Sequence, residues 1–145
     1  MRFVDTNIPL YAVSPHPEDI LKRRVSRELL AQNTDQLALS VQVLGELYFQ
    51  VTRPTRSGTL THNEAVTVIE ELKRHHVQPL TPETFDMAMH YRESFGLSYW
   101  DCLILAAAKQ SECDAVYSED MSASQDYDGI RVINPFAAAS ELAPV

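Results

Sequence analysis

The sequence has few cysteines and no long hydrophobic run. Cys102 and Cys113 are its only cysteines, and they do not form a Cys-x-x-Cys pair. The longest apolar run, from Cys102 to Ala108, is far too short to span a bilayer. The first residues do not resemble a signal peptide. We therefore expect reduced cysteines, no membrane segment and a cytoplasmic location.

Basic residues are also scarce. The chain has 12 Lys and Arg against 20 Asp and Glu, a formal net charge of -8. Broad binding to a phosphate backbone needs clustered Lys and Arg, so the composition argues against it. A nucleic-acid enzyme is still possible, because divalent cations can neutralise an acidic site while a local basic rim holds the substrate. Three short stretches could form such a rim or be solvated helix faces: Arg53 with Arg56, Lys22 to Arg24, and Lys73 to His76.

No repeat, linker or composition shift divides the 145 residues, so we expect a single domain over 1–145. Short apolar strands alternate with amphipathic helical segments, which predicts an α/β fold with a parallel sheet covered by helices on both faces. The expected strands are Phe3–Val4, Leu37–Leu39, Val77–Leu80, Ala115–Ser118 and Ile130–Ile133. The tail from Phe136 to Val145 is expected either to form a short helix or to remain frayed.

The chain is organised around its opening residues. The strand formers Phe3 and Val4 run directly into Asp5-Thr6-Asn7, three residues that favour turns and helix caps. Asp5 should therefore lie at the carboxyl end of a buried strand, just before a helix. In open α/β sheets, ligands and catalytic groups gather at that edge.

Four carboxylates stand out by their context. Asp5 and Asp120 each follow a strand, whereas Glu46 and Asp101 lie in helical segments among apolar neighbours. Several carboxylates brought together raise one another's pKa and lower stability, so a cluster makes sense only with a cation. Oxygen ligands without thiolates or paired histidines favour Mg²⁺ or Mn²⁺.

Each acid also has a purely structural interpretation, and for each acid taken singly this interpretation is at least as good as the functional one. Asp5 could cap the following helix, Glu46 could pair with Arg53 or Arg56, Asp101 could complete a capping box begun by Ser98, and Asp120 could be a turn residue. The functional interpretation rests on the four acids as a set.

This set resembles the PIN-domain nucleases, and in length and layout most of all the ribonuclease toxins of bacterial VapBC toxin–antitoxin pairs. The matching pieces are Phe3 to Asn7, Ser40 through Glu46 to Tyr48, Leu97 to Asp101 leading into Leu103 to Ala108, Tyr117 to Met121, and Val132 to Phe136. The resemblance covers nearly the whole chain. Each motif is loose alone, but their order and spacing together are specific.

The resemblance implies a fold and a set of residue roles. The fold would be a single PIN-like domain with a five-stranded parallel sheet of order 3-2-1-4-5, flanked by helices on both faces. The catalytic acids would be Asp5, Glu46, Asp101 and Asp120, with Asp5, Asp101 and Asp120 as metal ligands and Glu46 positioning or deprotonating the attacking water. Thr6 and Ser118 would support the site through hydroxyl hydrogen bonds, Asn7 would orient Asp5 or the backbone, and Glu119 would point away from Asp120.

The resemblance also implies an activity and partners. The protein would be a Mg²⁺-dependent endoribonuclease and the toxin of a type II toxin–antitoxin pair; transfer, ribosomal and messenger RNA all remain open as substrates. It would pair with itself and be inhibited by an antitoxin that offers a basic side chain to the acids, which the net charge of -8 suits. The apolar residues Leu21, Val25, Leu47 and Tyr48 would line the antitoxin groove or belong to the core.

Two other functions remain as alternatives. A phospho-receiver domain also binds Mg²⁺ in an α/β fold, but it needs an acidic pair after the first strand, an aspartate after the third and a lysine after the fifth. Here Asp5 stands alone, the third strand ends at Leu80-Thr81, and Asn134-Pro135 follows the fifth. The second alternative is a PIN-like module that binds partners without catalysis.

Overall fold

The protein is built around a twisted sheet that is mostly parallel. The computed structural model describes residues 1–122 and 125–137. The strands are β1 (Arg2–Val4), β2 (Leu37–Ser40), β3 (His76–Gln78), β4 (Ala115–Tyr117), β5 (Asp126–Tyr127) and β6 (Ile130–Ile133). Their order is β3-β2-β1-β4-β6-β5, and every neighbouring pair is parallel except β5 with β6. The expected order of five parallel strands is confirmed by β3-β2-β1-β4-β6.

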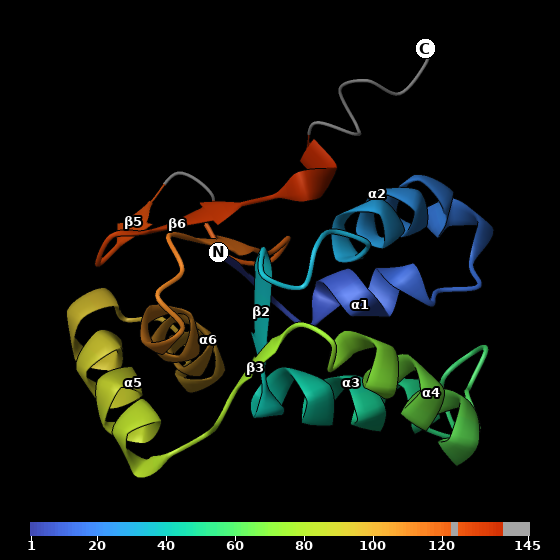
Figure 1. Cartoon of the computed structure of the whole chain (residues 1–145), viewed down its shortest axis with the longest axis horizontal. Coiled ribbons are helices and arrows are strands. Elements are labelled where there is room, and N and C mark those ends of the chain that lie inside the picture. The colour runs from blue at the N-terminus through green and yellow to red at the C-terminus, as the bar shows by residue number, and fades with distance from the viewer. Residues whose placement is uncertain (123–124, 138–145) are drawn as a thin grey trace.

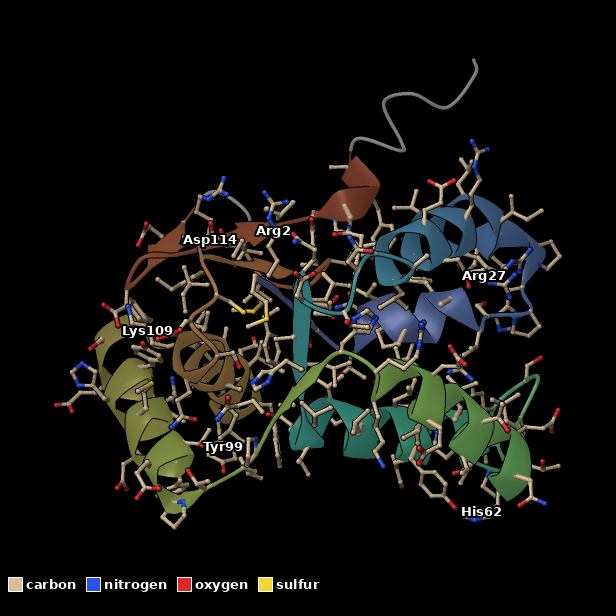
Figure 2. The ribbon with its side chains drawn as sticks, in the orientation of Figure 1. Arg2, Arg27, His62, Tyr99, Lys109 and Asp114 are labelled. Atoms are coloured by element: carbon tan, nitrogen blue, oxygen red, sulfur yellow. The ribbon has the colours of Figure 1, made fainter. Side chains whose placement is uncertain are left out.

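The short edge strand β5 is an addition that the sequence analysis missed. It pairs antiparallel with β6 through a two-residue turn, Asp128-Gly129, in which both residues have positive φ (55° and 85°). An Asp-Gly pair in this conformation is typical of a tight β-hairpin. The Lys109 ammonium, at one end of α6 in Figure 2, donates to the Asp128 carbonyl over 2.8 Å and holds the hairpin in place.

Helices connect the parallel strands, and their starts follow the expected caps. They are α1 (Asn7–Ala12), α2 (Ile20–Leu30) after the 3₁₀ turn η1 (Pro17–Asp19), α3 (Val41–Thr52), α4 (His62–Leu72), α5 (Pro82–Phe95) and α6 (Tyr99–Gln110). The hydroxyls of Ser40, Thr61, Thr81 and Ser98 each accept a backbone N–H three residues further on. Gly96, with φ of 69°, ends α5 in the left-handed conformation.

The two faces of the sheet are covered by different helices. Phe3, Ala38 and Val116 point into a core that also contains buried residues of α3, α4, α5 and α6. Their neighbours Val4, Leu37 and Tyr117 point the opposite way, into a smaller core with α1 and α2. Figure 1 shows α5 and α6 together on one flank of the molecule, with α1 to α4 on the other. This alternation confirms a sheet covered on both faces.

The structure also bears on the predictions for the C-terminal tail, for the groove residues and for a membrane segment. Residues 135–137 are helical, whereas the rest of the expected tail, 138–145, lies outside the described residues, so the domain boundary of 1–145 stays a prediction. Leu47 is fully buried in the core and is unavailable to any groove, while Leu21 is exposed. No helix in the described segments has the length and apolar character needed to cross a membrane.

Candidate active site

The site lies where the chain leaves β1 and β4, the neighbouring strands at the centre of the sheet. The Asp5 N–H donates to the Tyr117 carbonyl over 3.0 Å, which continues the β1–β4 ladder by one residue. Ser118 therefore lies beside Asp5, although 112 positions separate Asp5 from Tyr117 in sequence. The chain continues from β1 to β2 on one side and from β4 to β6 on the other. Because these two connections diverge, a crevice is expected between them at the carboxyl ends of the strands.

Asp5 is the most buried of the four acids, at 8% exposure. One carboxylate oxygen accepts the Thr6 N–H over 2.7 Å, and the other accepts the Ser118 hydroxyl over 2.8 Å. Burial raises the pKa of Asp5 to about 6, although both hydrogen bonds oppose the rise; Asp101 and Glu46 add repulsion. Thr6, not Asp5, occupies the cap position of α1, so Asp5 does not cap this helix.

Thr6 and Asn7 connect the opening motif to two other acids. The Thr6 hydroxyl donates to Glu46 over 2.7 Å, and the Asn7 amide donates to Asp120 over 3.1 Å. The Asn7 side-chain oxygen also accepts the backbone N–H of Glu119 over 3.4 Å. The tripeptide Asp5-Thr6-Asn7 thus supplies one acid and positions two more.

Glu46 lies on α3 with both carboxylate oxygens engaged. The Gln42 amide, one helical turn earlier, donates to it over 2.9 Å, opposite the bond from Thr6. Gln42 also reaches the Trp100 carbonyl over 3.4 Å, which connects α3 to the start of α6. Among the described residues Glu46 forms no ion pair with Arg53 or Arg56, so the surface-pair interpretation does not hold.

Asp101 lies in the first turn of α6, at the helix end that Tyr99 marks in Figure 2. Its backbone N–H donates to the Ser98 hydroxyl over 3.2 Å, so the residue contributes to the expected cap. Partial burial raises the pKa of the Asp101 carboxyl, a hydrogen bond with Ser98 opposes the rise, and the charges of Asp120 and Glu46 add to it. Ser98 therefore caps the helix through the Asp101 N–H, the expected reciprocal bond of a capping box is not among the contacts of the described residues, and the Asp101 carboxylate faces the other acids.

All four acids line one cavity of about 260 Å³, which we call the acid cavity. Its lining residues are Asp5, Thr6, Asn7, Leu10, Glu46, Phe49, Gln50, Asp101 and Asp120. The donor set consists of carboxylate oxygens and a threonine hydroxyl, the chemistry that Mg²⁺ and Mn²⁺ prefer, and its mutual repulsion calls for positive charge. Within the described residues no group of three His, Cys, Asp or Glu side chains is close enough to hold one ion as it stands. The donors thus fit a hard divalent cation in kind, while binding would require them to move closer.

Glu119 points away from the acid cavity, as expected. Its carboxylate accepts the Tyr11 hydroxyl over 2.9 Å and forms an ion pair with Lys22 over 2.9 Å. The Lys22 ammonium also lies 4.8 Å from the centre of the Tyr11 ring. This network fastens α2 and α1 to the segment that carries Asp120.

Several residues of this site were not predicted from the sequence. Gln42 could have been found, because it precedes Glu46 by one helical turn on the same face. Leu10, Phe49 and Gln50 line the acid cavity without a sequence signal that separates them from core or surface residues. The Lys22–Glu119 pair joins positions 97 residues apart and could not be found from local pattern.

Replacing Ser118 with alanine is expected to raise the pKa of Asp5 above about 6, because the Ser118 hydrogen bond favours the ionised carboxylate. The hydroxyl also accepts the backbone N–H groups of Asp120 and Met121 over 3.2 and 3.4 Å, so its loss should destabilise the protein by about 1–3 kcal/mol. Carboxyl ¹³C NMR titration measures the pKa. An unchanged or lowered pKa in Ser118→Ala would contradict the assigned contact.

Comparison with known proteins identifies the family. A family model described as "PIN domain" matches residues 2–125. The chain belongs to the PIN-domain family. A search of curated protein sequences finds no significant match. The match includes all four acids and every strand through β4, so the expected resemblance is confirmed and the phospho-receiver alternative is set aside.

Solved structures show the same fold at low sequence identity. A toxin–antitoxin complex from Klebsiella pneumoniae aligns with a TM-score of 0.67 and 18% identity, over 93% of this chain and 98% of that chain. FitAcB from Neisseria gonorrhoeae aligns with a TM-score of 0.63 and 21% identity, over 94% and 99%. VapC20 from Mycobacterium tuberculosis, a toxin that cleaves the sarcin–ricin loop, aligns with a TM-score of 0.62 and 18% identity, over 90% and 99%. This PIN domain therefore has the fold of VapC-type toxins.

Proposed function

We propose that this PIN domain hydrolyses RNA phosphodiester bonds as the toxin of a type II toxin–antitoxin pair. The observation that carries the proposal is the convergence of Asp5, Glu46, Asp101 and Asp120 on one cavity at the switch point of the sheet. Such a cluster lowers stability unless a cation is bound. A fold maintained only for packing gains nothing from it.

Asp5, Asp101 and Asp120 are the residues that would hold Mg²⁺, or Mn²⁺ in its place. A divalent cation bound there supplies positive charge for the phosphate oxygens and lowers the pKa of bound water. The protein's own contribution is to fix the ligands: Ser118 and the Thr6 N–H hold Asp5, and Asn7 holds Asp120. Ionised Asp5 is the form that binds a cation, so binding should weaken as the pH falls below the Asp5 pKa of about 6.

Glu46 is the residue that positions and deprotonates the attacking water. Thr6 and Gln42 donate to its two oxygens over 2.7 and 2.9 Å, so its orientation is fixed from both sides. A carboxylate held in this way can accept a hydrogen bond from water and take its proton during attack on phosphorus. Loss of Thr6 or Gln42 would leave Glu46 in place but poorly oriented.

The partners follow from the similar structures. The Klebsiella structure is a toxin–antitoxin complex, and VapC20 is a toxin that cleaves the sarcin–ricin loop. We extend this to the present chain: a cognate antitoxin inhibits it by presenting a basic side chain to the acid cavity, and the chain forms a homodimer. Its two free, buried cysteines suit the reducing cytoplasm.

Single substitutions of the acids test the proposal. Asp5→Asn, Asp101→Asn, Asp120→Asn and Glu46→Gln are each expected to lower the rate of RNA cleavage by roughly 10³-fold or more, because each removes a ligand or the proton acceptor. The matched control is Asp86→Asn, which replaces an exposed aspartate on α5. The control should keep wild-type cleavage.

The alternative of an inert binding module makes the opposite prediction. Folded wild-type protein would then leave RNA intact in Mg²⁺ and in Mn²⁺. Equal activity in the wild type and in all four variants would instead show that cleavage arises from a contaminant or from another site.

A further inference from the structure

A second cavity opens beside the acid cavity and shares a wall with it. It has a volume of about 300 Å³ and is lined by Asn7, Leu10, Tyr11, Ser14, His16, Asp19, Arg56 and Asp120. Asn7, Leu10 and Asp120 line both cavities. We call the second one the side cavity. Because the two cavities share these lining residues, a ligand that extends beyond one of them would reach the other.

Arg56 is the one permanently positive side chain among the residues that line the two cavities. A polyanion that approaches four carboxylates needs such a group near them. Phosphate binds arginine well, because the planar guanidinium can donate two parallel hydrogen bonds.

The Arg56 guanidinium is also available, since it makes no hydrogen bond or ion pair with any residue of 1–122 or 125–137. Most other candidates for a basic rim are engaged. Lys22 pairs with Glu119, Arg23 donates to the Ser14 carbonyl, Arg24 pairs with Glu28, Lys73 with Glu70, and Arg74 with Glu71. Arg53 is free and exposed, but it lines neither cavity.

The two acidic side chains in the side cavity have partners within the protein. The buried Ser14 hydroxyl donates to Asp19 over 2.6 Å, and Asn7 donates to Asp120 over 3.1 Å. The same Ser14 hydroxyl accepts the His16 N–H over 3.3 Å, which fixes the loop that forms one wall. Tyr11 also lines this cavity, with its ring already in contact with the Lys22 ammonium and with Phe136.

The loop that carries Arg56 is held tightly against that wall. Gly58 has φ of 73°, and a Cβ placed on it would lie 2.5 Å from Cγ of Pro15. Only glycine allows the two loops to approach this closely in this conformation. The position of Arg56 over the side cavity thus depends on a specific contact two residues away.

We propose that the side cavity binds the nucleotide next to the scissile phosphodiester in a single-stranded RNA, with Arg56 contacting its phosphate. This inference rests on the proposed ribonuclease function. Arg56 is a substrate-binding residue in this account, and the acid cavity carries out the reaction.

The test measures binding of a short, fluorescently labelled, mixed-sequence single-stranded oligoribonucleotide to the full-length protein in a chelator, so that cation-dependent cleavage does not interfere. Arg56→Gln is expected to weaken binding about tenfold. It should also reduce the slope of log affinity against log salt by about 0.7, the value for one phosphate contact on a single strand. Arg53→Gln is the matched control, because it removes the same charge from the same loop outside the cavity.

A steady-state measurement with Mg²⁺ and a cleavable RNA adds a second readout. Arg56→Gln should lower kcat/KM about tenfold, mainly through a higher KM, while Arg53→Gln stays within about twofold of the wild type. Gly58→Ala should resemble Arg56→Gln both in its weaker binding and in its lower salt slope, because it moves Arg56 off the cavity and so removes the same phosphate contact. Thermal unfolding confirms that each variant is folded.

The outcomes separate this inference from the proposed function. Equal effects of Arg56→Gln and Arg53→Gln, or no effect of Arg56→Gln, would overturn the side-cavity site even if the wild type cleaves RNA. A wild type that binds the oligoribonucleotide through Arg56 but cleaves no RNA would instead overturn the ribonuclease proposal and leave the binding site supported. A wild type that binds no RNA would overturn the side-cavity site, whatever the outcome of the cleavage assay.

Discussion

Replacing Asp5 with asparagine is expected to stabilise the protein at neutral pH in the absence of divalent cations. The pKa of Asp5 is about 6 in the folded state, against 3.8 for an unperturbed aspartate. The unfolded state therefore loses this proton at lower pH than the folded state does. The free energy of unfolding should fall by about 3 kcal/mol as the pH rises through this window, and the whole penalty persists at pH 7.

Urea unfolding in a chelating buffer measures this effect. The stability of Asp5→Asn relative to the wild type should increase by about 2–3 kcal/mol between about pH 4 and about pH 7. At pH 7 the net gain should be smaller, about 1–2 kcal/mol, because asparagine has one acceptor oxygen for the two donors Thr6 N–H and Ser118 hydroxyl. Asp86→Asn, the surface control, should show no such pH dependence. A constant difference between Asp5→Asn and the wild type across this range would contradict the account.

Adding Mg²⁺ is expected to raise the unfolding temperature of the wild type. A cation that binds the folded state at a hundred times its dissociation constant contributes about 2.7 kcal/mol, or roughly 8 °C for a domain of this size. The reason is that the cation offsets the repulsion among the four carboxylates of the acid cavity. Differential scanning fluorimetry with a Mg²⁺ series measures the shift.

Variants separate specific binding from general ionic effects. Asp5→Asn and Asp101→Asn should lose most of the shift, whereas Asp86→Asn should keep it. Equal shifts in all of these proteins would mean that Mg²⁺ acts away from the acid cavity.

Taken together, these results would show a site that lowers stability in order to bind its cofactor. The four carboxylates share one cavity, and hydrogen bonds from Ser118, Thr6, Asn7 and Gln42 fix three of them. Substitutions that stabilise the metal-free protein are therefore the ones expected to remove activity. This inverse relation is typical of functional sites and is not expected for core residues.

Much of the fold could be predicted from local signals. Apolar runs such as Ala115 to Tyr117 identified the strands, and the caps Ser40 and Ser98 identified helix starts, because both depend on residues within one turn or strand. The strand β5 was not predicted because two residues are too few to show an alternating hydrophobic pattern, although the Asp128-Gly129 turn indicated a hairpin. Strand order came from the family resemblance, since no local pattern determines which strands pair.

In the site, too, local features could be predicted from the sequence and long-range contacts could not. Each acid was recognised from its neighbours in sequence, but the contacts of Asn7 with Asp120 and of Thr6 with Glu46 span 113 and 40 residues. Such contacts depend on packing in three dimensions. The side cavity and the approach of Gly58 to Pro15 were beyond sequence analysis for the same reason.

The central claim is that the acid cavity hydrolyses RNA with a divalent cation, and the most direct measurement is cleavage of purified total RNA by the wild-type protein. The protein must be folded and free of antitoxin, and the reaction is run with Mg²⁺, with Mn²⁺ and with excess chelator. The account predicts discrete cuts that require the cation and disappear in Asp5→Asn. Intact RNA under both cations, or cuts that persist in the chelator or in Asp5→Asn, would contradict it.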